Sequence, residues 1–122
     1  MPLTIGSRLE DGIAILELDG SLTLGPSLVS LRNAARDMLA KPRLDGIILD
    51  VQRITSVDSS GLGELTIVYS SSSRHNSPMR LVHVSPNLHK MLQMTHLDAV
   101  LASAEDIETA KKEIKNSKDP NR

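Results

Sequence analysis

The stretch with the most evident chemical potential is VDSSGL, residues 57–62, in which an aspartate and two serines precede a glycine. It lies between an apolar run and a helix-like run at residues 62–73. A side-chain oxygen of Asp58, Ser59 or Ser60 can accept a hydrogen bond from the free amides of the first helical turn, which stabilises a helix by about 1 kcal/mol. In this interpretation the stretch is a helix cap and has no chemistry of its own.

The same position also suits a phosphorylated serine. A helix N-terminus carries roughly half a positive charge and several free backbone amides, so a phosphate can be added there without disrupting the fold. The added charge of about −1.5 to −2 would act instead on a protein that docks against this surface, because like charges brought together across an interface cost several kcal/mol. Residue types alone leave helix capping and a phosphorylation switch as two open functions.

The remaining residue types argue against catalysis and against metal binding. The chain has no cysteine, which excludes disulfides and thiolate sites. The histidines lack the spacing of a metal-binding pair and an accompanying acidic cluster; they are His75, His83, His89 and His96. The Gly-x-Ser-x-Gly sequence of a serine hydrolase does not surround Ser59, and no glycine-rich phosphate loop is present. We therefore expect no catalytic residue, no metal and no cofactor.

Composition limits the classes of partner. The 122 residues fit one domain, and their net charge of −1 arises from 14 basic and 15 acidic residues that are intermixed along the chain. Without a basic stripe, and with Tyr69 as the single aromatic residue, the chain is a poor candidate for binding nucleic acid. No stretch approaches the roughly 20 apolar residues that span a bilayer, and no signal peptide is visible. We expect a cytoplasmic protein without direct membrane insertion.

Five strands are expected, at residues 3–10, 13–18, 44–51, 79–84 and 99–102. Asp11-Gly12 joins the first two, because this pair favours the positive φ angles of a two-residue hairpin turn. Asp19-Gly20 is expected to break the second strand. Residues 44–51, LDGIILDV, form the compact apolar run of a buried central strand that leads into the motif.

Four helices are expected where apolar residues recur at helical spacing. Their shared faces are Leu28, Leu31, Ala35, Met38 and Leu39; Leu62, Leu65, Val68, Tyr69 and Ser72; Leu88, Met91 and Leu92; and Ile107, Ala110 and Ile114. Pro26 suits the first position of the first helix, Pro42 stops the chain soon after it, and Ser85 begins the short third helix. Ser103 is expected to cap the last helix, with Asp106 three residues later as in a capping box.

The resulting order ββαβαβαβα predicts a single α/β domain. Strands alternating with helices indicate a mostly parallel sheet, and the amino-terminal hairpin adds an antiparallel pair. We expect a mixed sheet of four to five strands with about four helices over residues 1–116, and a flexible tail at residues 117–122.

The sequence resembles the STAS domains of bacterial anti-sigma factor antagonists over nearly its whole length. The most specific part is LDVQRITSVDSSGLGEL at residues 49–65, where a strand ending in Leu-Asp leads to Asp-Ser-Ser-Gly-Leu-Gly and an apolar helix. LDGSLT at residues 18–23 resembles the loop after the family's second strand. LVHVSPNLHKMLQMTHL at residues 81–97 resembles the family's strand, its Pro-led helix and its Thr-x-Leu ending.

The resemblance implies a binding protein and not an enzyme. Unphosphorylated members bind an anti-sigma factor that is also a serine protein kinase, and so free a sigma factor for transcription. The kinase phosphorylates the serine directly after the motif aspartate, here Ser59, and the complex dissociates until a serine phosphatase restores the active form. The implied partner-binding residues are Asp58, Ser59, Ser60, Gly61 and Leu62 in the motif, and Gly20, Ser21, Leu22 and Thr23 in the neighbouring loop.

Three positions depart from the family pattern. Thr23 stands where aspartate is frequent, His96 replaces the glycine of Thr-Gly-Leu, and a serine run at residues 70–73 replaces basic residues, leaving Arg74 as the nearby base. Glycine adopts positive φ freely and histidine does so only at some cost, so we expect the end of the short helix to differ. The altered residues also point to a different choice of partner.

Two alternatives keep the fold and change the function. One is a scaffold subunit of a stressosome-like complex, and the other is the accessory STAS subunit of a membrane lipid ABC transporter. The sequence leaves the oligomeric state open.

Overall fold

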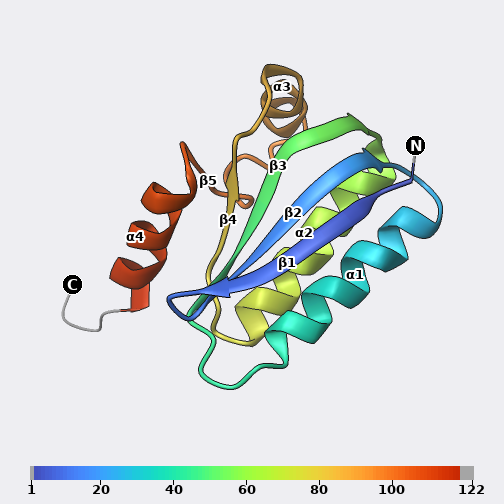
Figure 1. Ribbon diagram of the computed structural model, residues 1–122. Helices are drawn as coiled ribbons and strands as arrows, with labels where there is room; N and C mark the ends of the chain where they lie inside the picture. The colour runs from blue at the N-terminus through green and yellow to red at the C-terminus, as the bar shows by residue number, and fades with distance from the viewer. Residues whose placement is uncertain (1, 119–122) are drawn as a thin grey trace.

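The structure, a computed structural model, describes residues 2–118 and has the predicted order ββαβαβαβα (Figure 1). Its elements are β1 (Thr4–Glu10), β2 (Ile13–Leu22), α1 (Pro26–Leu39), β3 (Gly46–Val57), α2 (Ser59–Arg74), β4 (Met79–Val82), α3 (Pro86–Met94), β5 (Ser103–Ala104) and α4 (Ile107–Lys118). The single α/β domain expected from the sequence is confirmed.

The five strands form one mixed sheet in the order β1-β2-β3-β4-β5. β1 and β2 are antiparallel, and every later neighbour pairs in parallel. Asp11 and Gly12 have φ angles of 55° and 79°, as the predicted hairpin turn requires. α1 and α2 lie side by side on one face of the sheet, α4 covers part of the other, and α3 lies beyond the carboxyl ends of β3 and β4 (Figure 1).

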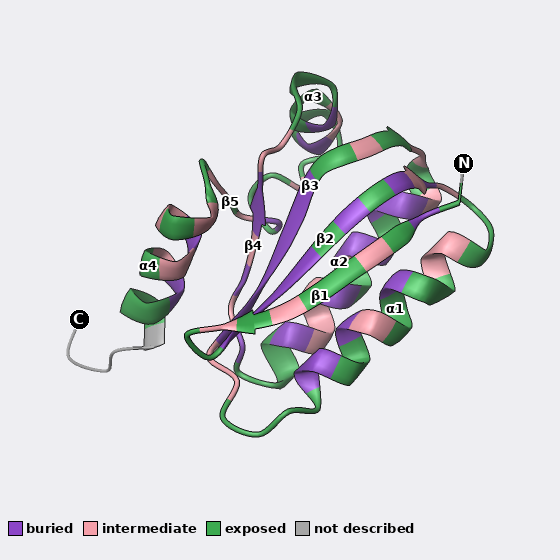
Figure 2. Ribbon diagram, in the orientation of Figure 1, coloured by how far each residue is buried: buried purple, intermediate pink, exposed green. Residues whose placement is uncertain are grey.

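The core is aliphatic and has a part on each face of the sheet (Figure 2). The larger part lies under α1 and α2, and it includes the predicted helix-face residues Leu31, Ala35, Leu65 and Val68. The smaller part joins α4 to the sheet and contains Ile15, Ile48, Val82, Ala110 and Ile114 among its members. The helical periodicity therefore identified the buried faces correctly.

The prediction that β2 breaks at Asp19-Gly20 is wrong, because the strand continues through Leu22. Gly20 absorbs the irregularity with a φ of 124°, and the pairing register with β3 shifts on either side of it. β3 likewise extends beyond the predicted residues 44–51, as far as Val57. The two strands consequently stay paired up to Leu22 and Val57, directly beside the motif.

The carboxyl-terminal elements also begin later than predicted. The last strand is Ser103–Ala104 and not residues 99–102, because these two residues pair with β4. Ser103 does not cap α4; Asp106 does, by accepting a hydrogen bond from Thr109 N at 2.8 Å. β4 ends at Val82, where His83 turns out of extended geometry with a φ of 59°.

α4 continues through the first two residues of the stretch predicted to be a tail. The remainder of that stretch, residues 119–122, lies outside the described residues.

α3 ends in the hydrogen-bonding pattern of a Schellman turn, although a histidine occupies the glycine position. Leu97 N donates to Leu92 O at 2.9 Å and His96 N donates to Gln93 O at 3.1 Å. His96 adopts the required positive φ of 61°. The substitution noticed in the sequence therefore leaves the glycine-type turn in place, at the conformational cost expected for a side chain there.

The first turn of α2 lies against the end of β2, and Gly61 makes this close approach possible. A Cβ atom at Gly61 would collide with the carbonyl oxygen of Leu22, whereas a Cβ atom at Gly63 would meet nothing within 4 Å. The two glycines of the motif thus differ: one is required by backbone packing and the other faces open space.

This difference predicts opposite effects of two identical substitutions. Gly61→Ala should lower the free energy of unfolding by about 3 kcal/mol, because the backbones must separate. Gly63→Ala should leave it unchanged or raise it by up to about 1 kcal/mol, because alanine is the better helix former. Urea denaturation of both variants measures the contrast, and equal stabilities would contradict this account of the packing.

Candidate functional site

The candidate site lies at the carboxyl-terminal edge of the sheet, where β3 passes into α2. Asp58 is the N-cap of α2, with extended backbone angles of −110° and −176°, and Ser59 is the first helical residue. Ser59 is exposed, while Asp58 and Ser60 are half-buried. Ligand sites of parallel α/β sheets concentrate at this edge.

The carboxylate of Asp58 connects two segments of the chain. Its Oδ1 accepts a hydrogen bond from Gly61 N at 2.9 Å, which caps α2, and its Oδ2 accepts one from Leu24 N at 3.0 Å, in the loop between β2 and α1. These amides, that of Leu24 first, lower the pKa of Asp58 below its ordinary value. Asp58 therefore fixes the helix start and the neighbouring loop together.

The Ser59 hydroxyl takes no part in this capping. It has no hydrogen-bond partner among residues 2–118 and lies at the surface. Asp58 therefore supplies the helix cap, and Ser59 presents a hydroxyl that no residue among 2–118 binds.

The loop residues predicted to lie beside the motif do so, but only some present side chains there. Leu22 and Leu62 are 0% and 4% exposed and pack in the core, and Gly20 and Gly61 are buried. Their side chains cannot contact a partner, so any role of these four is limited to shaping the backbone. The residues with surface-accessible side chains are Asp58, Ser59, Ser60, Ser21 and Thr23.

Ser21 belongs to a small hydroxyl cluster at the same edge of the sheet. Ser56 Oγ donates to Ser21 Oγ at 3.1 Å, and Ser21 Oγ lies 3.4 Å from Thr55 Oγ1. These bonds join the ends of β2 and β3 immediately before the motif.

Sequence reasoning missed two apolar features at this edge of the sheet. Leu24, whose amide binds Asp58, is 77% exposed, and Met94 of α3 is 71% exposed. A cavity of about 560 Å³ lies between the end of β3 and α3, with Val57, Leu88 and Met91 in its lining. Leu24 could have been found from its position, because a leucine between a strand and a Gly-Pro pair shares no helix or strand face.

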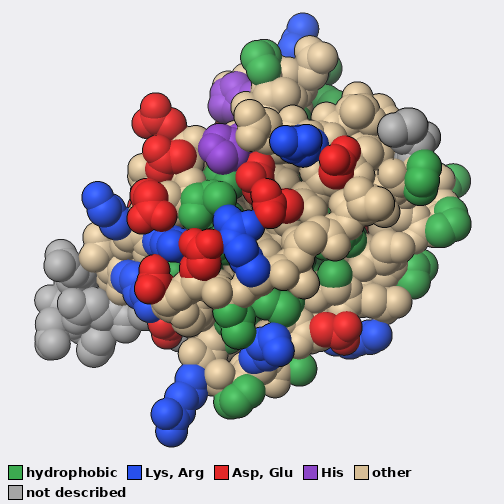
Figure 3. Space-filling view, viewed as in Figure 1, with side chains coloured by type: hydrophobic (Ala, Val, Ile, Leu, Met, Phe, Trp, Pro, Cys, Tyr) green, Lys and Arg blue, Asp and Glu red, His purple; other side chains and the backbone are tan. Residues whose placement is uncertain are grey.

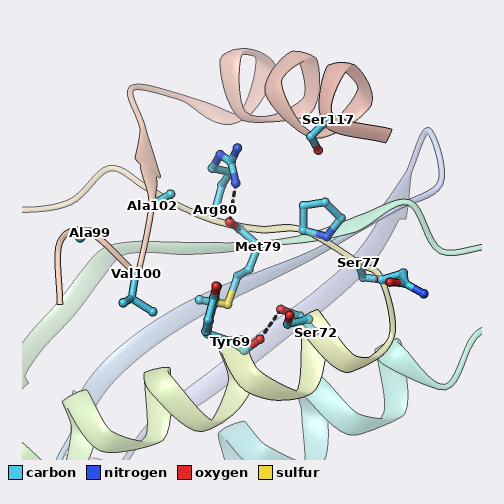
Figure 4. A pocket seen from close by; sticks show the side chains of 12 residues that line it. Tyr69, Ser72, Ser77, Met79, Arg80, Ala99, Val100, Ala102 and Ser117 are labelled. Carbon is cyan, nitrogen blue, oxygen red and sulfur yellow. Dashed lines mark hydrogen bonds between the residues drawn. The ribbon is translucent and has the colours of Figure 1, made fainter. Parts of the chain in front are cut away.

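A larger cavity of about 760 Å³ lies away from the motif, at the outer edge of β4 (Figure 4). Three of its polar side chains are bonded within the protein: Ser72 Oγ donates to Tyr69 O at 2.8 Å, Ser117 Oγ donates to Ile114 O at 2.9 Å, and Arg80 pairs with Glu113. The two serines thus bind backbone carbonyls of their own helices, and the arginine binds an acidic residue of α4.

Acidic and basic side chains are interspersed on the face seen in Figure 3.

Within residues 2–118, no group of three or more histidine and acidic side chains is arranged to hold a metal ion. In the same part of the chain, no helix has the length and apolar character needed to cross a membrane.

The hydrogen bonds to Asp58 predict a specific acid sensitivity. Because they lower the folded-state pKa of Asp58 below its unfolded value of about 3.9, the carboxylate stabilises the fold above that pH and loses this effect as the pH falls through the folded-state pKa. Asp58→Asn should therefore be less stable at pH 7 and should lose less stability on acidification. Denaturation midpoints between pH 2 and 7 measure this change.

Asp37→Asn is the matched control, because Asp37 is an exposed carboxylate on α1 that accepts no hydrogen bond from an amide within residues 2–118. An acid-induced loss of the same size in the wild type and in Asp58→Asn would contradict the bridging role of Asp58.

Comparison with known proteins places this geometry in a family. The family model described as the STAS domain matches residues 5–112. An anti-sigma factor antagonist from Mycobacterium paratuberculosis has a similar structure, with a TM-score of 0.78 and 17% identity over 93% of this chain and 94% of that chain. SpoIIAA of Bacillus in the phosphorylated form has a TM-score of 0.68 and 18% identity, over 89% and 98% of the two chains.

A sulfate transporter family protein from Wolinella succinogenes is similar as well, with a TM-score of 0.70 and 18% identity over 88% of each chain. At these identities the structural likeness establishes the fold alone. The family match covers most of the sequence and includes the Asp58–Gly63 motif. The chain belongs to the STAS domain family.

Proposed function

We propose that this STAS domain is an anti-sigma factor antagonist that is switched off by phosphorylation of Ser59. In the unphosphorylated form it binds an anti-sigma factor that is also a serine protein kinase, and thereby frees a sigma factor in the cytoplasm. The observation that carries the proposal is the exposed, unbonded Ser59 hydroxyl at the start of a helix that Asp58 already caps.

The surroundings of the two motif serines favour Ser59 over Ser60 as the phosphate acceptor. Ser60 is half-buried, and it lies four residues before Glu64, hence on the same face of α2. Glu64 is only 2% exposed and binds Arg32 at 2.7 Å, so a phosphate on Ser60 would compete with this buried carboxylate for the same guanidinium group. Ser59 is followed at the same spacing by Gly63, which has no side chain to oppose the phosphate.

The phosphate would act on the partner and not on the fold of its own chain. The kinase transfers the γ-phosphoryl group of ATP to Ser59 Oγ, the hydroxyl proton is released, and ADP leaves. The helix N-terminus tolerates the new charge of about −1.5 to −2, whereas a docked protein that presents negative charge is repelled. A serine phosphatase that hydrolyses the ester restores binding.

The fold neighbours support this function. SpoIIAA, an anti-sigma factor antagonist, has been observed in unphosphorylated and phosphorylated forms. A protein with this fold can therefore carry the modification and keep its fold. The surface around Ser59 adds an exposed apolar residue, Leu24, of the type that anchors protein interfaces.

A second candidate function is that of a STAS subunit in a membrane transporter, because the fold also occurs in a sulfate transporter family protein. Such a subunit would co-purify with transporter components and would need no kinase. The free hydroxyl at Ser59 favours the antagonist.

Incubation with ATP and the anti-sigma serine kinase from the same genome tests the proposal. Mass spectrometry should place one phosphate on Ser59, and Ser59→Ala should remain bound to the kinase when ATP is present. Ser59→Asp should bind at least about 100-fold more weakly, since each tenfold change corresponds to about 1.4 kcal/mol.

Ser117→Asp, an equal change of charge on an exposed serine of α4, should bind like the wild type, because α4 packs on the opposite face of the sheet from α1 and α2. A phosphate found on another residue, or absent, would contradict the assignment.

A further inference from the structure

The groove between α1 and α2 combines apolar and cationic side chains that have no part in the proposed Ser59 switch. This α1–α2 groove has a volume of about 470 Å³. Ala35, Leu39 and Val68 give it an apolar floor, and Arg36 and Arg74 stand at its rim on opposite helices. Its two helices lie on the opposite face of the sheet from α4 (Figure 1).

The two rim arginines keep their charge available. Arg36 donates to the amide oxygen of Asn33 at 2.9 Å, and Arg74 donates to the hydroxyl of Ser71 at 3.2 Å. Neither pairs with a carboxylate among residues 2–118. Arg32, on the same wall as Arg36, is instead neutralised by Glu64 at 2.7 Å. The end of the groove near Arg74 is therefore cationic.

Exposed apolar side chains continue from the groove toward Ser59. Ile67 at the groove is 43% exposed, Val29 on α1 is 52% exposed, and Leu24 lies beside the Asp58 carboxylate. Gly63 and Ser71 lie four residues before and after Ile67, on the same face of α2. Because neither has a large side chain, they leave room for a partner beside Ile67. Exposed apolar side chains are thus present at the groove, on α1 and in the loop before α1.

We propose that the α1–α2 groove receives an acidic amphipathic helix of the same partner that binds at Ser59. This inference rests on the proposed function. An amphipathic helix places its apolar face in a groove between two helices, and acidic residues at the edges of that face would pair with Arg36 and Arg74. The 16 residues from Ser59 to Arg74 extend about 24 Å, which an interface of ordinary size can cover.

The groove and the phosphate should act separately. Charges at exposed positions are screened beyond about 8 Å at physiological ionic strength, so a phosphate on Ser59 leaves the distant arginines able to bind. The groove should then strengthen binding of both the unphosphorylated and the phosphorylated form by a similar factor, while Ser59 determines the difference between them.

Isothermal titration calorimetry with the anti-sigma serine kinase tests the groove. Arg36→Glu and Arg74→Glu should each weaken binding about tenfold and together about 100-fold, with a shallower dependence of affinity on salt. Ile67→Asp should weaken binding by at least about tenfold, and Ile67→Leu should not. Both arginines are exposed and lie in the last turns of their helices, so each glutamate variant should lower the thermal unfolding midpoint by no more than a few degrees.

Lys112→Glu is the matched control, because Lys112 is exposed on α4, which packs on the opposite face of the sheet from α1 and α2. It should bind within twofold of the wild type.

The outcomes separate the two proposals. If the groove variants bind like the wild type while Ser59→Asp does not, the groove inference is overturned and the Ser59 switch stands. If Ile67→Asp alters the oligomeric state of the free chain in size-exclusion chromatography, the groove binds a second copy, which also overturns the inference. If the wild type does not bind the kinase, both proposals are wrong.

Discussion

The arrangement of the candidate site depends on a carboxylate that binds two backbone amides from separate segments. Asp58 holds the first turn of α2 through Gly61 N and the loop after β2 through Leu24 N. Without this bridge a serine would have to cap the helix, and its hydroxyl would be occupied. Because an aspartate performs the capping, the next residue can be an exposed serine. The same bridge presents Leu24 beside that serine.

The rest of the fold makes the bridge possible. Parallel pairing of β2 with β3 brings Leu22 next to Val57, so the two carboxyl ends meet at one edge of the sheet. Gly61 then lets α2 start in contact with the Leu22 carbonyl. On the outer surface of the same helix, Ile67 and Arg74 lie farther from Ser59, so the proposed groove is separate from the proposed phosphorylation site.

Patterns that depend on local chemistry could be predicted from the sequence. Asp11-Gly12 specifies its turn by positive φ, and the spacing of Leu31, Ala35 and Leu39 identifies a buried helical face. Features that are set by tertiary pairing could not be predicted from the sequence. Gly20 was expected to end β2, but pairing with β3 carries the strand through it. The start of α4 was expected at Ser103, but that residue pairs with β4 and leaves the cap to Asp106.

The candidate site shows the same division. The motif identified the place of Asp58 and Ser59, because cap residues and glycines have a recognisable order. The motif did not show which neighbouring side chains are exposed. Leu22 and Leu62, which were expected to bind a partner, face the core, and the exposed Leu24 was overlooked. The position of Leu24 between a strand and a Gly-Pro pair was a local signal of its exposure that sequence reasoning did not use.

The central claim is that Ser59 can carry a phosphate while Asp58 keeps the helix start and the loop in place. An NMR map of amide chemical shifts, comparing the Ser59-phosphorylated and unphosphorylated protein, tests it most directly. The account predicts changes confined to the loop around Leu24 and to the first turn of α2. Changes spread through β3 and the core of α1 would contradict it, because the phosphate would then act by rearranging the fold.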